Sequence, residues 1–227
     1  MTDTDILDGI RPRSEEMAEG RYEFRVWPRG PASTIALLHS RWPLAGAETR
    51  ADIYLSTTQS PWTLVKLRAG TRLEIKRRGT DLGVLQYWTC PVSAEFPLSR
   101  RLLRALAGAL GLPGGLPPEA ALTPAHLLAA LALAAPRVTP VTVRKARLTF
   151  CRGTCRAEIC RAAVFGRMRK TVAIEDADPR FARAGIAVLG IDGLPNLSYG
   201  DLLRPRLLPL TGPRRTPTHP EAARRPS

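Results

Sequence analysis

Several segments of this chain alternate charged and apolar residues with a period of two, and this pattern constrains the fold most strongly. Clear examples are residues 64–68 (LVKLR), 73–78 (LEIKRR) and 143–147 (VRKAR). Strict alternation is typical of a β-strand whose two faces differ, one charged and one apolar. The charged faces then hold Lys66 with Arg68, Glu74 with Lys76 and Arg78, and Lys145 with Arg147.

Lysine is rare in the chain and is placed selectively. Of 34 basic residues only four are Lys, and three of these, Lys66, Lys76 and Lys145, lie in the alternating segments. A chain that otherwise uses Arg retains Lys here, which indicates a need for a compact, hydrated point charge. If the charged faces converge, they form a cationic concavity that suits a polyphosphate.

The overall charge also favours an anionic partner. The formal net charge is +14, although residues 1–20 are acidic. A nucleotide, a polyphosphate, a nucleic acid or an acidic membrane surface would each match this charge. Arginine spread over solvated faces is the alternative interpretation of the total, but it does not account for the alternation.

The pattern along the chain predicts the following elements. Strands are expected at residues 21–27, 49–55, 62–69, 72–78, 84–89, 138–151, 155–165 and 170–174, with hairpin turns at 70–71 and 152–154. Helices are expected at residues 31–39, 98–112, 123–135 and 178–189. Thr123 before Pro124, and Asp178 before Pro179, are typical helix starts, and Gly190 is a typical stop.

These elements predict an α+β fold built on an antiparallel eight-stranded closed β-barrel with flanking helices. A flat sheet would crowd half of the charges, whereas a barrel of about eight strands has an interior wide enough for a small ligand. The predicted organisation is an acidic arm (1–20), a tunnel domain (21–207) with a helical insert (98–136), and a disordered Pro/Arg-rich tail (208–227).

The order of the motifs resembles that of the CYTH, or triphosphate tunnel metalloenzyme, superfamily, over roughly residues 21–204. The residues that carry the resemblance are, in chain order, Glu23 and Arg25, Asp52 and Tyr54, Lys66, Arg68 and Lys76, Lys145 and Arg147, Glu158, Glu175, and Ser198-Tyr199. The resemblance implies metal-dependent hydrolysis of a triphosphate or polyphosphate-containing compound. Tripolyphosphate, a nucleoside triphosphate and a thiamine derivative all stay open as ligands.

The resemblance implies a role for each matched residue. Catalysis would fall to Glu23, Lys66, Arg68, Lys76, Lys145 and Arg147. Substrate phosphates would be bound by the same basic residues together with Arg25 and Arg78. Mg²⁺ or Mn²⁺ would be held by Glu23, Glu158 and Glu175, with Glu74 as a further candidate.

Two departures from the family pattern weaken the metal site. The family opens with Glu-x-Glu-x-Lys, whereas this chain has Arg21, Glu23 and Arg25. Ala173 stands where many relatives carry the first acid of a Glu-x-Glu pair. Mg²⁺ commonly uses only one or two carboxylates plus substrate phosphates, so a reduced site could still assemble around a ligand. Alternatively, each Glu is a counter-ion for its Arg neighbours.

Two other functions remain open. The first is a non-catalytic polyphosphate- or nucleotide-binding module of the same fold. The second is nucleic-acid binding through the basic exterior and the tail. Aromatic residues on the predicted strands could stack on bases, although core packing is the commoner role for such residues.

The location is expected to be cytoplasmic. The N-terminus is acidic and has no apolar segment of the kind found in a secretory signal. The longest apolar stretch, residues 125–135, is interrupted by His126 and is shorter than the ~20 residues of a membrane span. The oligomeric state stays open.

Overall fold

We describe a computed structural model of the chain, which covers residues 20–28, 32–57 and 62–204. The predicted acidic arm, apart from Gly20, and the predicted tail lie outside the described residues.

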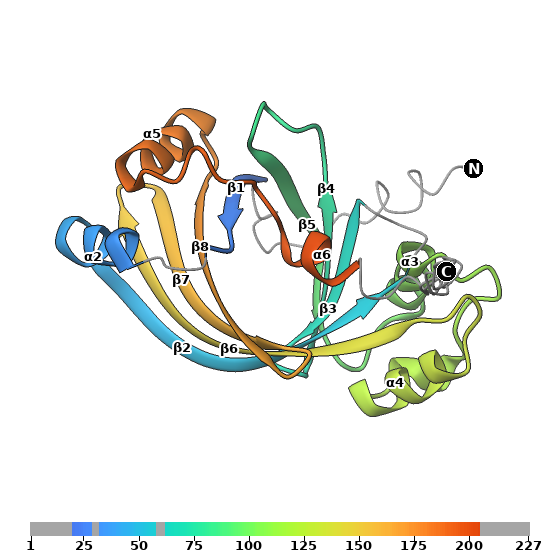
Figure 1. The fold of residues 1–227 in the computed structure, drawn as a ribbon. Helices are drawn as coiled ribbons and strands as arrows, with labels where there is room; N and C mark the ends of the chain where they lie inside the picture. The colour runs from blue at the N-terminus through green and yellow to red at the C-terminus, as the bar shows by residue number, and fades with distance from the viewer. Residues whose placement is uncertain (1–19, 29–31, 58–61, 205–227) are drawn as a thin grey trace, which may run out of the picture.

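Within the described residues, eight strands close into an antiparallel barrel in the order β1-β5-β4-β3-β2-β6-β7-β8 (Figure 1). Their bounds are β1 (Arg21–Val26), β2 (Leu44–Ser56), β3 (Thr63–Arg68), β4 (Arg72–Arg78), β5 (Gln86–Glu95), β6 (Thr139–Arg152), β7 (Cys155–Val164) and β8 (Arg167–Asp176). The predicted fold class is therefore confirmed. Sheet closure leaves no free strand edge, so the inner and outer faces of the barrel are distinct surfaces.

The helices lie outside the sheet or at its end. They are α2 (Ala32–Arg41), α3 (Arg100–Leu110), the 3₁₀-helix η1 (Pro118–Ala121), α4 (Pro124–Ala132), α5 (Pro179–Leu189) and α6 (Tyr199–Leu203). The predicted start signals are confirmed, because the Thr123 side chain caps α4 and the Asp178 side chain caps α5. The Gly190 stop signal is also confirmed, because this residue adopts φ 60° as the C-cap of α5.

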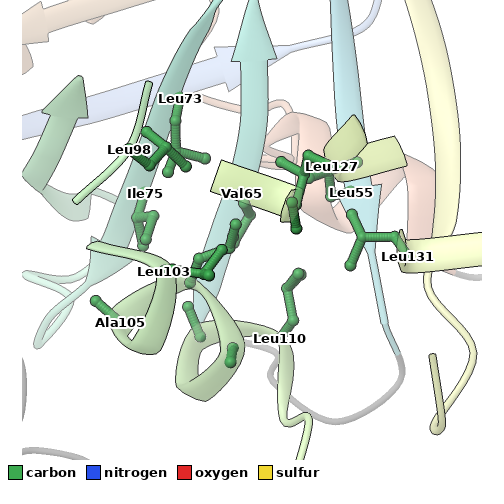
Figure 2. Close-up of a cluster of buried hydrophobic side chains, with 14 of the residues drawn as sticks. Leu55, Val65, Leu73, Ile75, Leu98, Leu103, Ala105, Leu110, Leu127 and Leu131 are labelled. Atoms are coloured by element: carbon green, nitrogen blue, oxygen red, sulfur yellow. The ribbon is translucent and has the colours of Figure 1, made fainter. Parts of the chain in front are cut away.

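One hydrophobic cluster covers the outer face of β3 and β4. Leu103, Leu106 and Leu110 of α3 pack with Leu73 and Ile75 of β4, and residues of η1 and α4 extend the cluster (Figure 2). The Leu/Ala-rich middle of the chain therefore supplies the core on this side of the barrel. The helices of this region pack against the apolar residues that alternate with the charged ones in β3 and β4.

A second cluster covers the outer face of β1, β7 and β8. Phe24 of β1 and Ile174 of β8 are fully buried there against Ile186 of α5 and Leu38 of α2. Burying the apolar face of each alternating strand outside the barrel directs the charged face inward, because successive side chains point to opposite sides.

Three strands are longer than the alternation predicts. β8 runs from Arg167 to Asp176 rather than over residues 170–174. β2 begins at Leu44 rather than residue 49, because Ala45, Gly46 and Ala47 carry no alternating signal. β5 starts at Gln86 and continues to Glu95 past Pro91, where the sequence favours a stop. In the described residues, no helix has both the length and the apolar character needed to cross a bilayer. The cytoplasmic location stays a prediction.

Candidate functional site

Inward-facing charged side chains from seven of the strands form one set, which we call the charged interior. Strand register brings them together: Glu48 lies opposite Arg147, Arg50 opposite Lys145, and Glu23 opposite Glu175. Residues paired across neighbouring strands share a face of the sheet. The set comprises Glu23, Arg25, Glu48, Arg50, Asp52, Lys66, Arg68, Glu74, Lys76, Lys145, Arg147, Arg156, Glu158 and Glu175.

The charged interior is solvent-accessible at the end where Glu48 lies. Along β2, the exposed fraction of the side chain rises from 0% at Asp52 to 7% at Arg50 and 44% at Glu48. The opening therefore lies at the Glu48 end. A ligand that enters there would reach Asp52 last.

Helix α6 closes the opposite end. The Tyr199 ring stacks on Tyr54 with centroids 5.4 Å apart, and apolar inner-face residues of β6 and β7 cluster around it. Asn196 fixes the chain before α6 to β1, because its side chain accepts a hydrogen bond from the Arg25 amide and donates one to the Glu23 carbonyl. The Ser198-Tyr199 motif thus forms the floor of the interior.

Lys145 lies at this floor. Its Nζ donates hydrogen bonds to Asp52 Oδ2 (2.8 Å) and Tyr54 Oη (2.7 Å), and it sits 3.9 Å from the centroid of the Tyr199 ring. Burial, reinforced by the charge of Lys66, lowers the pKa of Lys145 to about 7, although Asp52 opposes this shift. Lys145 is therefore close to its titration point at neutral pH.

Asp52 pairs with three cations and is fully buried. Arg50 and Lys145 each lie 2.8 Å from its carboxylate and Lys66 lies 3.8 Å away. Burial alone would raise the pKa of Asp52, but Lys145 and Lys66 together hold it well below its usual range. Asp52 is therefore an ionised anchor for three basic side chains.

Arg25 joins two acids from different strands. Its Nε donates to Glu23 Oε1 (2.8 Å), and its Nη1 donates to Glu158 Oε1 (2.9 Å). Ala173 lies between Arg25 and Glu158 in the register of β1, β8 and β7, and its short side chain leaves room for the guanidinium to reach across. Arg25, at the position where the CYTH motif pattern has lysine, therefore bridges Glu23 and Glu158.

Two basic side chains of the set have unused hydrogen-bonding capacity. Lys76 forms no ion pair within the described residues. Burial would raise the pKa of Glu23, but the positive charges of Arg25 and Lys76 lower it. Arg147 contacts Glu158 and Glu48, but its Nε is buried without a hydrogen-bond partner in the described part of the chain. A buried donor without a partner is costly, which makes Arg147 Nε a candidate for contact with a ligand anion. Lys76 is half-buried and is a second candidate because its charge has no ion-pair partner among the described residues.

The remaining ion pairs of the set differ in their exposure to solvent. Lys66 pairs with Glu74 (2.8 Å), and Arg68 lies 3.5 Å from the same carboxylate. Arg156 pairs with Glu175 at 3.2 Å, and about half of its side chain is exposed. The Arg68 and Arg156 side chains, 41% and 45% exposed, are more hydrated than the groups at the floor and can rearrange at lower cost, whereas Lys66 and Glu74 are both only 8% exposed.

The buried ion pairs predict a loss of stability in acid. Burial would raise the pKa of Glu158, but Arg25 and Arg147 lower it to about 2, from a usual value of 4.5. The stabilisation from this group is therefore present above pH 4.5 and is lost as pH falls towards 2, and it amounts to as much as about 3 kcal/mol. Urea unfolding between pH 7 and pH 3 should show this decline. The decline should be smaller in Glu158→Gln, and an equal decline in both proteins would contradict the assignment.

The sequence-predicted residues can now be placed. Those assigned to catalysis and metal binding all face the charged interior, as does Arg25. Arg78 instead lies beside α6, where it pairs with Asp81 and lies 3.8 Å from Asp201. Glu48, Arg50 and Arg156 were assigned no role. The alternation Glu48-x-Arg50-x-Asp52 was a signal that could have identified the first two.

The predicted metal ligands do not fit a divalent ion as they are arranged. The Arg25 guanidinium links Glu23 to Glu158, and Arg156 pairs with Glu175. Within the described residues, no three acidic, His or Cys side chains are grouped so that they could hold a metal. The carboxylates of the set act as counter-ions, which was the alternative reading of the sequence.

No protein-family model and no curated protein matches the sequence. Solved structures do match. A candidate adenylyl cyclase from Hippeastrum, HpAC1, for which a dominant triphosphatase activity is described, aligns with a TM-score of 0.53 at 12% identity, covering 85% of this chain and 99% of that one. A conserved hypothetical protein from Pyrococcus furiosus aligns with a TM-score of 0.48 at 14% identity, covering 81% of this chain and 99% of that one. A candidate adenylate cyclase from Bacillus halodurans aligns with a TM-score of 0.46 at 11% identity, covering 80% and 96%.

At these identities a structural match shows a shared fold and not a shared activity. The alignment with HpAC1 has a TM-score above 0.5 and spans nearly all of HpAC1. The match agrees with the barrel topology and with the order of the sequence motifs. The predicted resemblance is therefore confirmed at the level of the fold: this chain has the triphosphate tunnel fold of CYTH proteins.

Proposed function

We propose that this protein binds a triphosphate or polyphosphate-containing compound within the charged interior. The observation that carries the proposal is the unused capacity of two inward-facing cations, Lys76 and Arg147 Nε. The set contains eight Lys and Arg side chains and six Asp and Glu side chains, so its formal charge also favours an anion. Phosphate oxygens accept charge-assisted hydrogen bonds from both kinds of basic side chain.

The position of the basic residues supports a chain of phosphates rather than a single one. Lys76 and Arg147 belong to different strands, β4 and β6. Lys66 and Lys145 lie deeper, 3.8 Å and 2.8 Å from the Asp52 carboxylate. An extended polyanion entering at the Glu48 end would meet Arg68 first and Lys145 last. The basic residues predicted from the sequence, apart from Arg78, would thus contact successive phosphates.

Hydrolysis of the bound phosphoanhydride is the second candidate function. The shared fold favours it, because HpAC1 is described with a dominant triphosphatase activity. The sequence predicted that Glu23, Glu158 and Glu175 would hold Mg²⁺ or Mn²⁺ for this reaction. Since Arg25 and Arg156 hold these carboxylates, we derive no catalytic step through a metal. Phosphate release from tripolyphosphate, measured with Mg²⁺, with Mn²⁺ and with EDTA, separates hydrolysis from binding alone.

Nucleic-acid binding through the exterior stays a prediction with less support. The tail, on which it partly depends, lies outside the described residues. Of the aromatic residues that could stack on bases, Phe24, Tyr54 and Trp88 are buried. Trp62 is exposed, but it packs against the Arg78 guanidinium.

Lys76→Gln should weaken tripolyphosphate binding by roughly 10- to 100-fold, because it removes a charged donor that has no ion-pair partner in the described part of the chain. Isothermal titration calorimetry on the purified protein measures this effect. Thermal stability should change little, since no described ion pair is lost.

Arg144→Gln is the matched control. Arg144 is exposed on the outer face of β6, next to Lys145 in sequence but on the opposite side of the sheet. The Arg144→Gln substitution removes one positive charge, as Lys76→Gln does. It should leave the affinity for tripolyphosphate within about twofold of the wild type, because exposed charges are strongly screened. Equal losses in the two variants would indicate a nonspecific charge effect, and absence of binding by the wild-type protein would overturn the proposed function.

A further inference from the structure

Arg25 occupies the space between the two carboxylates best placed to share a metal ion. Its guanidinium lies 2.8 Å from Glu23 and 2.9 Å from Glu158, and its Nη1 also lies 3.5 Å from Thr171 Oγ1. The side chain is 8% exposed, and those of Glu23 and Glu158 are 13% and 11% exposed. The three groups form a compact, largely desolvated ion triad.

The other interior acids are also paired. Asp52 holds Arg50, Lys145 and Lys66, and Glu74 holds Lys66 and Arg68. Glu48 contacts Arg50, Arg68 and Arg147. Within the described residues, each acid of the charged interior is thus neutralised by at least one Lys or Arg.

A divalent ion could reach Glu23 and Glu158 only by displacing Arg25. A guanidinium does not lose its proton in proteins, so the displaced side chain would remain charged. An unpaired charge buried among the remaining cations is strongly unfavourable. The interior as built therefore favours Arg25 over a metal at these two carboxylates.

We propose that the charged interior binds its polyphosphate as the metal-free anion, with Arg25 as the fixed counter-cation of Glu23 and Glu158 where these acids would otherwise hold a divalent ion. This inference rests on the proposed function and specifies the form of the ligand. A bound Mg²⁺ would cancel two negative charges of the ligand and occupy phosphate oxygens that Lys76 and Arg147 would otherwise contact. Mg²⁺ should therefore compete with the protein for the ligand.

The wild-type protein provides the deciding measurement. Tripolyphosphate is titrated calorimetrically into the full chain, once in buffer with EDTA and once in buffer with excess Mg²⁺. The affinity in EDTA should be higher than that in Mg²⁺. Binding that requires Mg²⁺, or that is equal or tighter when Mg²⁺ is added, would overturn the inference while leaving the proposed function intact. Absence of binding in both buffers would overturn the proposed function and the inference with it.

Two variants test the role of Arg25. Arg25→Gln frees Glu23 and removes one of the two arginines paired with Glu158, which keeps Arg147. Arg156→Gln frees Glu175 alone and changes the net charge equally. Electron paramagnetic resonance of Mn²⁺, in the absence of any phosphate, should show binding by Arg25→Gln but not by the wild type or by Arg156→Gln. In EDTA, Arg25→Gln should bind tripolyphosphate about tenfold more weakly than the wild type, because Glu23 then faces the anion unneutralised and Glu158 keeps only Arg147 as a counter-ion.

The outcomes of the variant experiment separate cleanly. Mn²⁺ binding by the wild type, or by Arg156→Gln as strongly as by Arg25→Gln, would contradict the assignment of Arg25 to the metal position. A folded Arg25→Gln that binds no Mn²⁺ would contradict it as well. If Arg25→Gln does not fold, the wild-type titrations with and without Mg²⁺ still decide the inference.

Discussion

Asp52→Asn is expected to lower the free energy of unfolding by about 3–5 kcal/mol, the cost of removing one partner from a buried ion pair. The Asp52 side chain is fully buried and contacts Arg50, Lys66 and Lys145. Asparagine preserves the shape but not the charge, so three cations would remain crowded without their shared anion. Urea unfolding at neutral pH, followed by circular dichroism, measures the change.

Glu95→Gln provides the control for this prediction. Glu95 forms an ion pair with Arg72 at 2.7 Å, but its side chain is 69% exposed. Loss of an exposed pair should cost less than about 1 kcal/mol. If Asp52→Asn were no more destabilised than Glu95→Gln, the interior would be far more hydrated than the exposures indicate, and the account of Asp52 as an anchor would be wrong.

The affinity for tripolyphosphate is expected to fall by as much as about 50-fold between pH 7 and pH 9, because Lys145 must be protonated to favour a bound anion. Its pKa in the free protein is lowered to about 7, so the amine predominates at higher pH. A polyanion near Nζ stabilises the ammonium form, and binding is then coupled to proton uptake. Calorimetric titrations at a series of pH values measure the slope directly.

Lys145→Met separates this effect from the ionisation of the ligand. Tripolyphosphate titrates in the same way with either protein, so the difference between the two pH profiles isolates Lys145. The variant should bind more weakly than the wild type at pH 7 and should show a flatter profile. Parallel profiles would exclude a titrating Lys145 as the source of the pH dependence.

The lowered pKa of Lys145 also makes the free energy of unfolding depend on pH. Between pH 7 and pH 10.5 the unfolded chain carries a proton on Lys145 that the folded chain has lost. Stability rises with pH wherever the unfolded state binds more protons. The contribution of Lys145 to stability therefore increases over this window, opposite in direction to its effect on ligand affinity.

The alternation of residues determined the strands and which side chains share a face. Lys66, Arg68 and Lys76 could be placed on one surface because side-chain direction in a strand is a local property with a period of two. Helix ends were also local, since capping depends on single residues such as Asp178 and Gly190. Elements without such signals were misjudged at their ends, as the start of β2 shows.

The pairing of charges was decided only by the tertiary structure. Arg25 and Glu158 are far apart in sequence and meet across β8. Arg78 lies near Asp201 of α6 rather than in the charged interior. Sequence order lists the acids and bases but does not indicate which of them contact each other. Such contacts depend on barrel closure and strand register, which are set by many distant residues at once. The alternation in the sequence therefore determined that the strands have a charged face. The folded barrel decided which acidic side chains of that face pair with which arginines and lysines.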